Sequence, residues 1–97
     1  MRRYEMMTVL DADLDSETVE ASLKKIESLI AKNNGKIDKV EPMGKRRLAY
    51  EINHKREGNY TVYYFQGESE TVKEIDRVLG ITDEVIRFGI FRLPEQK

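Results

Sequence analysis

Residues 47–66, Arg-Leu-Ala-Tyr-Glu-Ile-Asn-His-Lys-Arg-Glu-Gly-Asn-Tyr-Thr-Val-Tyr-Tyr-Phe-Gln, contain the pattern that decides the fold. The first six residues alternate between apolar and polar and predict a strand, and the aromatic and β-branched residues of 60–66 predict another. The polar residues between them, 53–59, predict the loop of a β-hairpin. We expect the first strand to run from Ile37 to Asn53, with a bulge or bend where Pro42 and Gly44 interrupt it.

One helix is predicted before this hairpin in the sequence and one after it. The first begins at Asp15 or Ser16 and ends at 33–35, where Gly35 is expected to adopt the left-handed conformation. Its apolar residues recur at helical spacing on one stripe: Val19, Leu23, Ile26, Leu29 and Ile30. The second helix is expected to start with Ser69 as its cap and to stop at Gly80, with the stripe Val72, Ile75, Val78 and Leu79.

Two further strands, 3–10 and 85–93, lie at the two ends of the sequence and complete the order βαββαβ. With right-handed crossovers, this order predicts an α+β, ferredoxin-like fold: a four-stranded antiparallel sheet with both helices on one face. Strands 3–10 and 60–66 are then central, and the other two are edges. We expect one domain, residues 1–97. Its core is expected to contain Met6, Leu10, Leu23, Ile26, Ile30, Ile75, Leu79, Phe88 and Ile90.

The composition excludes several classes of protein. Of the 97 residues, 39% are hydrophobic and 36% are charged, with a net charge of −1, so the low hydrophobicity and high net charge of a disordered chain are absent. There is no cysteine, which excludes disulfides and thiol chemistry. The apolar runs are a few residues long, whereas a membrane helix needs about 20. No signal-peptide stretch follows Met1.

The nearly neutral total hides a segregation of charge. Residues 11–34 and 68–84, both mainly helical in this prediction, carry net charges of −3 and −4. Residues 43–56 carry five bases against one acid, a net charge of +4. A protein that binds a polyanion can be neutral overall if its positive charges gather on one side.

No set of residues suited to catalysis or metal binding stands out. His54 is the only histidine and is expected in a polar surface loop. Asp11, Asp13 and Asp15 alternate as in calcium loops, but the glycine and glutamate that complete such a loop are missing, so we expect a polar loop that leads to a helix cap. The six glycines are isolated, so there is no glycine-rich phosphate loop. The sequence therefore predicts no enzyme, no metal and no cofactor.

RNA recognition motifs share this strand order, and residues 57–64 match their third-strand signature only in part. Gly58, Val62 and Tyr64 agree with it, but the base-stacking positions hold Asn59 and Thr61. The platform on which bases stack is therefore absent. The basic run 45–47 has two interpretations, protection of an edge strand against aggregation and contact with phosphates, and the run alone favours neither.

Three stretches together resemble the ribosomal protein S-six family of the bacterial small subunit. They are Met1-Arg-Arg-Tyr-Glu5, Gly44-Lys-Arg-Arg-Leu-Ala-Tyr-Glu-Ile52, and Gly58 with Tyr60. The resemblance extends over the chain in length and element order. It implies a structural, non-catalytic protein of the cytoplasmic ribosome that binds the central domain of 16S ribosomal RNA together with ribosomal protein S-eighteen. It implies no membrane and no small-molecule substrate.

The resemblance and the basic block together define the expected RNA contacts: Arg2, Arg3, Lys45, Arg46, Arg47, Lys55, Arg56 and Arg87. A second expectation concerns the sheet face without helices, where strand parity exposes apolar side chains beside the protein partner: Tyr60, Val62, Tyr64 and Phe91. The alternative is a small-molecule-binding or acylphosphatase-like domain of the same fold. Against it, Asp11 and Asp13 follow the first strand where phosphate would have to bind.

Overall fold

The computed structural model describes residues 1–52 and 55–94, and the order of elements is the predicted one. Strand β1 spans Arg2–Asp11, helix α1 Ser16–Lys32, strand β2 Lys36–Ile52, strand β3 Lys55–Gly67, helix α2 Ser69–Gly80 and strand β4 Val85–Arg92. His54, expected in a surface loop, lies outside the described residues. None of the helices in the described ranges is long and apolar enough to cross a membrane.

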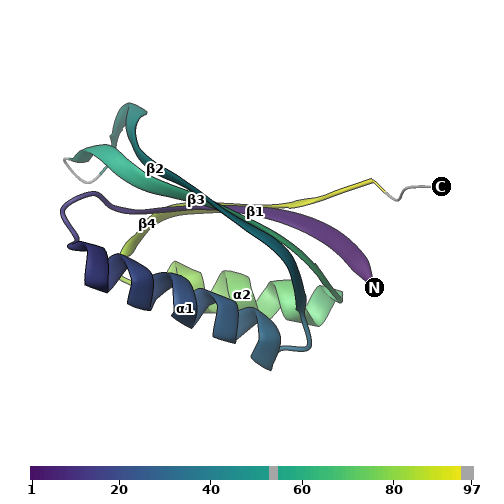
Figure 1. The fold of residues 1–97 in the computed structure, drawn as a ribbon. Coiled ribbons are helices and arrows are strands. Elements are labelled where there is room, and N and C mark those ends of the chain that lie inside the picture. Colours follow the sequence, from purple (N-terminus) through teal and green to yellow (C-terminus); the bar gives the residue numbers. More distant parts are fainter. Residues whose placement is uncertain (53–54, 95–97) are drawn as a thin grey trace.

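The four strands form one antiparallel sheet in the order β2-β3-β1-β4. Both helices lie on one side of it, below the sheet in Figure 1, and the other side carries no helix. The prediction of a ferredoxin-like α+β fold is thus confirmed. The central and edge positions of the strands are also as predicted.

The core lies between the helices and alternate residues of the two central strands. Tyr4 and Met6 of β1 face the helices, as do their cross-strand partners Phe65 and Tyr63. The rings of Tyr4 and Phe65 stack with centroids 5.4 Å apart. Most of the expected core is buried, including Leu10, while three of its members are half-buried and pack against the cluster from its margin: Leu23, Phe88 and Ile90.

The ends of α1 follow local side-chain chemistry. Asp15, one of the two predicted caps, accepts a hydrogen bond from the backbone N–H of Thr18 at 2.7 Å. At the other end the prediction for Gly35 was wrong: Asn34 takes the left-handed conformation, with φ of 65°. Gly35 is needed for a different reason, since a Cβ there would lie 2.6 Å from Ile30 Cγ2.

Helix α2 also starts differently from the prediction. Its cap is Glu68 and not Ser69, because the backbone N–H of Glu68 donates to the hydroxyl of Thr71 at 3.2 Å and so completes a capping box. The end at Gly80 is confirmed.

Two details of the strands differ from the expectation. Residues 55–59 belong to β3 instead of a loop, since their backbone pairs with β2 although the side chains are polar. On β4, a register shift opposite Val9 and Leu10 places Val85 against the core, although strict alternation from Phe88 would place Ile86 there. Neither difference changes the topology.

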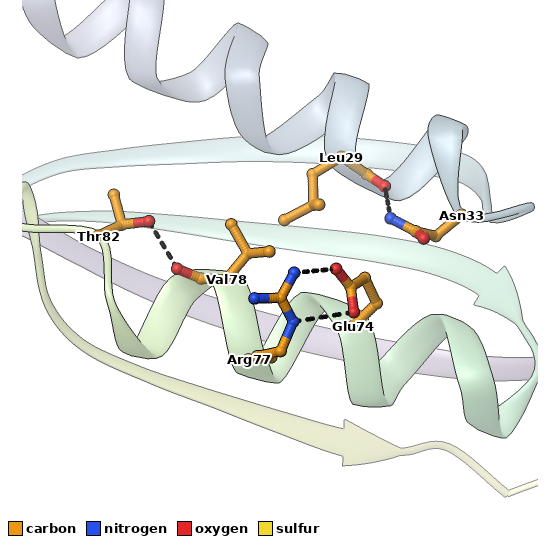
Figure 2. Close-up of polar contacts among 6 residues, drawn as sticks. All are labelled: Leu29, Asn33, Glu74, Arg77, Val78 and Thr82. Atoms are coloured by element: carbon orange, nitrogen blue, oxygen red, sulfur yellow. Dashed lines mark hydrogen bonds and ion pairs between the residues drawn. The ribbon is translucent and has the colours of Figure 1, made fainter.

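Few polar contacts join the two helices. Most of the polar contacts in this region lie within one helix or at its end. Figure 2 shows Asn33 donating to the carbonyl of Leu29, Thr82 donating to the carbonyl of Val78, and the Arg77–Glu74 ion pair within α2. Between the helices lies a hollow of about 670 Å³ with Leu29 and Val78 in its lining. Arg77 and Glu74 of α2 are thus already paired with each other.

Candidate nucleic-acid and partner interface

The β2–β3 hairpin extends beyond the end of the sheet and carries most of the basic block. We call residues 45–52 and 55–59 the hairpin arm. The last residue of β1 that pairs with β3 is Asp11, opposite Gly58, so the outer arm is a two-stranded ribbon. In Figure 1 the arm rises from the sheet on the side away from the helices. The predicted bend is present, with φ of 75° at Gly44 and a register shift beside Pro42.

An apolar contact attaches the arm to the open face of the sheet. Leu48 is only 7% exposed and Val9 of β1 only 1% exposed. Both adjoin Gly58: a Cβ built there would lie 2.2 Å from Val9 Cγ1 and 3.5 Å from Leu48 Cδ2. Glycine at position 58 therefore permits the close approach of the arm to β1.

Polar contacts of two arm residues, Lys55 and Tyr50, add to this attachment. Lys55 Nζ lies 2.6 Å from a carboxylate oxygen of Asp13 and 3.5 Å from one of Asp11. The hydrogen bond and charge of Lys55 lower the pKa of Asp13, and the same contacts raise the pKa of Lys55. On the opposite edge strand, Arg87 Nη1 donates to the hydroxyl of Tyr50 at 2.5 Å.

Four predicted phosphate-binding cations on the arm are exposed and have no acidic oxygen within ion-pair distance among residues 1–52 and 55–94: Lys45, Arg46, Arg47 and Arg56. Arg46 donates its Nε–H to the carbonyl of Met43, which leaves its other guanidinium N–H groups available. The structure therefore separates the predicted cations: these four are unpaired, whereas Lys55 and Arg87 already have partners within the chain.

Arg2 and Arg3 lie at the other end of the sheet. They pair with Gly67 and Gln66, nine and eight residues away from the Asp11–Gly58 pair along β1. At about 3.3 Å per residue, this separation is roughly 30 Å. The predicted cations thus form two groups, one on the arm and one at the N-terminal end of β1, and not one continuous patch.

The predicted partner residues on the open face, the face of the sheet without helices, differ in how exposed they are. Phe91 is 58% exposed, and Tyr60 and Tyr64 are half-buried, but Val62 is only 6% exposed. Burial raises the pKa of Tyr64, and the charges of Glu5 and Glu41 raise it further. Of these carboxylates, Glu41 lies 3.9 Å from Lys39 Nζ, so Glu5 is the one without a basic partner among the described residues. Of the four predicted partner residues, Phe91 is the most exposed.

Sequence reasoning missed the roles of Tyr50 and of the aspartates. Tyr50 lies in the stretch that decides the fold but was not among the predicted site residues, because a contact between opposite edges of a sheet leaves no periodic signal. Asp11 and Asp13 were interpreted as a polar loop, and they prove to be the partners of Lys55. In the described part of the chain, no three His, Cys, Asp or Glu side chains are grouped so as to hold a metal ion.

Comparison with known proteins identifies the family. The model of the family described as ribosomal protein S6 matches residues 3–92. The small ribosomal subunit protein bS6 of Symbiobacterium thermophilum is 50% identical over 95 residues, covering 98% of this chain and all of that protein. The corresponding protein of Corynebacterium jeikeium is 48% identical over 92 residues, 95% of this chain and 97% of that protein.

A solved structure agrees with both. The crystal structure of 30S ribosomal protein S6 from Thermotoga maritima superposes with a TM-score of 0.91 at 38% identity, covering 95% of this chain and 87% of that one. The chain therefore belongs to the ribosomal protein S6 family, whose members are structural, non-enzymatic components of the small ribosomal subunit.

Proposed function

We propose that this chain acts as a single ribosomal-protein domain in the cytoplasmic small subunit, where it binds the central domain of 16S ribosomal RNA together with ribosomal protein S-eighteen. The observation that carries the RNA part of this proposal is the hairpin arm. It projects from the sheet and presents the four unpaired cations.

Phosphate contact explains this arrangement physically. Lysine and arginine side chains that neutralise phosphates release condensed counterions, and this release drives binding without requiring a base-stacking platform. Arginine is particularly suited because its planar guanidinium can bind two phosphate oxygens at once. We assign the main phosphate contacts to the arm, and to Arg2 and Arg3 a second contact at the other end of β1.

Edge protection remains the competing explanation of the same residues. Strand β2 is an edge of the sheet, and charged side chains on an edge strand prevent it from pairing with another chain. The two explanations differ in what they predict for RNA binding, because only phosphate contact couples these cations to the salt concentration.

The test is RNA affinity as a function of salt. The double variant Arg46→Gln, Arg47→Gln should bind a central-domain RNA fragment more weakly, and the slope of log affinity against log salt should fall by somewhat less than one unit for each phosphate that is no longer neutralised. The matched control is Lys24→Gln, Lys25→Gln, which removes the same charge from the exposed side of α1. Unchanged affinity and slope in the arm variant would make the pair edge protection only. Equal reductions in the two variants would reduce the effect to net charge.

For the protein partner, we propose the open face around Tyr60, Val62, Tyr64 and Phe91. Phe91 is exposed and lies opposite Glu5 in the sheet, which suits a small basic protein, because apolar burial and charge complementarity then act on the same surface. Val62, being buried, contributes to the shape of this surface rather than to its accessible contacts.

Phe91→Ser should weaken the heterodimer with the S-eighteen-like partner while leaving the free energy of unfolding almost unchanged. The control is Ile81→Ser, because Ile81 is 73% exposed and follows α2, away from the open face. Isothermal titration with the purified partner measures the affinity of both variants. If Phe91→Ser binds as tightly as the parent protein, the interface lies on an edge strand or a loop, with β2 the next candidate.

A further inference from the structure

Arg87 and Tyr50 meet across the full width of the sheet. Tyr50 belongs to β2 at one edge and Arg87 to β4 at the other, with β3 and β1 between them. The guanidinium donates to the tyrosine hydroxyl at 2.5 Å, and its central carbon lies 5.5 Å from the centroid of the tyrosine ring. This distance is within the range of a cation–π interaction. The contact is possible only if the arm curls over the end of β1.

The arm needs such an attachment, because a two-stranded ribbon is at best marginally stable in water. Beyond the pair Arg47–Glu57, the ladder between β2 and β3 is irregular and resumes at Ile52–Lys55. Leu48 and Val9 attach the arm at its base, whereas Tyr50 lies further out and is 60% exposed. The bond to Arg87 therefore helps to fix the outer part of β2, together with the Lys55–Asp13 ion pair on the adjoining strand.

We propose that Arg87 and Tyr50 are positioning residues for RNA binding, and that they hold the arm in place so that its unpaired cations reach phosphates as a preorganised group. This inference rests on the proposed function. It assigns Arg87 a role different from the direct phosphate contact that the basic pattern predicted. Affinity increases because the arm is already ordered before binding, so less conformational entropy is lost on association.

The two roles for Arg87 predict different results. A direct contact depends on its charge, so Arg87→Gln should lower the salt slope and Tyr50→Phe should not affect binding. A positioning role depends on the hydroxyl bond, so Tyr50→Phe should by itself weaken binding with the salt slope unchanged. In that case the double variant Tyr50→Phe, Arg87→Gln should bind no more weakly than Arg87→Gln alone, because the two changes break the same interaction.

The experiment combines RNA affinity with amide hydrogen exchange of the free protein. Tyr50→Phe should reduce affinity for a central-domain RNA fragment roughly three- to tenfold, the effect of removing about one hydrogen bond. It should also accelerate exchange of arm amides without RNA. Tyr4→Phe, which removes a hydroxyl from the helix-covered side of the sheet and away from the arm, should do neither.

Three results would overturn the proposal: unchanged exchange in Tyr50→Phe, faster exchange with unchanged affinity, or a lower salt slope in Arg87→Gln with Tyr50→Phe binding normally. Failure of the proposed function is recognised separately. If the parent protein did not bind the RNA, or if Arg46→Gln, Arg47→Gln bound like the parent, the arm cations would not be RNA contacts, whatever the exchange experiment showed.

Discussion

The helix-covered face of the sheet and the hairpin arm are built by opposite means. On the covered face, fully buried side chains such as Met6 and Phe65 pack against two helices, and local ion pairs such as Arg77–Glu74 stay within one element. On the arm, an apolar contact and the polar contacts of Lys55 and Tyr50 hold a ribbon whose cations mostly have no acidic partner among the described residues. The covered face supplies stability, while the arm keeps charge available for a partner.

The largest expected effect is on the free energy of unfolding, when the same substitution, Phe→Ala, is made on each of the two faces of the sheet. Phe65→Ala should lower the free energy of unfolding by about 3–5 kcal/mol, because it leaves a cavity in the packed core. Phe91→Ala should change it by less than about 1 kcal/mol, because the side chain is already largely in water. Urea denaturation of both variants measures the difference. Similar reductions would mean that the open face contributes to the core.

The next effect concerns the junction of the arm with the sheet. Gly58→Ala should destabilise the protein by about 1–3 kcal/mol, because its Cβ would lie 2.2 Å from Val9 Cγ1. Gly80→Ala is the control, since a Cβ there has no neighbour within 4 Å. Val9→Ala combined with Gly58→Ala should recover part of the stability. If the two glycine variants were equally stable, the arm would not pack on β1 as described.

A smaller effect concerns the helix-covered face, where buried Tyr63 makes the free energy of unfolding depend on pH. Burial raises the pKa of Tyr63 above that of an unfolded chain, so the folded protein keeps the phenol protonated. Above about pH 10 the unfolded state loses this proton first, and stability from Tyr63 falls by up to about 1.4 kcal/mol per pH unit. Urea unfolding at pH 8 and above pH 10 should show this decrease. The Tyr63→Phe variant should lose less stability over the same interval.

The smallest effect tests the ion pair that joins the outer end of the arm to the residues after β1. Lys55 lowers the pKa of Asp13, so the pair is present above the unfolded value of 3.8 and breaks as the pH falls through the lower, folded value. An NMR titration of the Asp13 carboxyl should show its pKa move back towards 3.8 in Lys55→Met. The pKa of Asp15, lowered by its hydrogen bonds with Thr18, should not move. An unchanged Asp13 titration would mean that the pair does not persist in solution.

Local patterns in the sequence determined the element order, the fold and the helix stripes. Ile26, Ile30, Ile75 and Leu79 recur at helical spacing, and Tyr4, Met6, Tyr63 and Phe65 alternate along strands, so each element shows its buried side without reference to the others. Motif and composition indicated a protein of this family and located the basic block. Details such as the cap at Glu68 and the left-handed Asn34 were missed, because neighbouring residue types compete closely for these positions.

Only the tertiary structure decided how the cations are divided. Lys45, Arg46 and Lys55 belong to one basic block in the sequence, yet Lys55 is paired with Asp13, 42 positions away along the chain, while the other two have no such partner among the described residues. Arg87 meets Tyr50 across the sheet, 37 positions away. The physical reason is that ion pairs and ring contacts depend on distances of a few ångströms, and the curl of the arm sets these distances without leaving a period in the sequence.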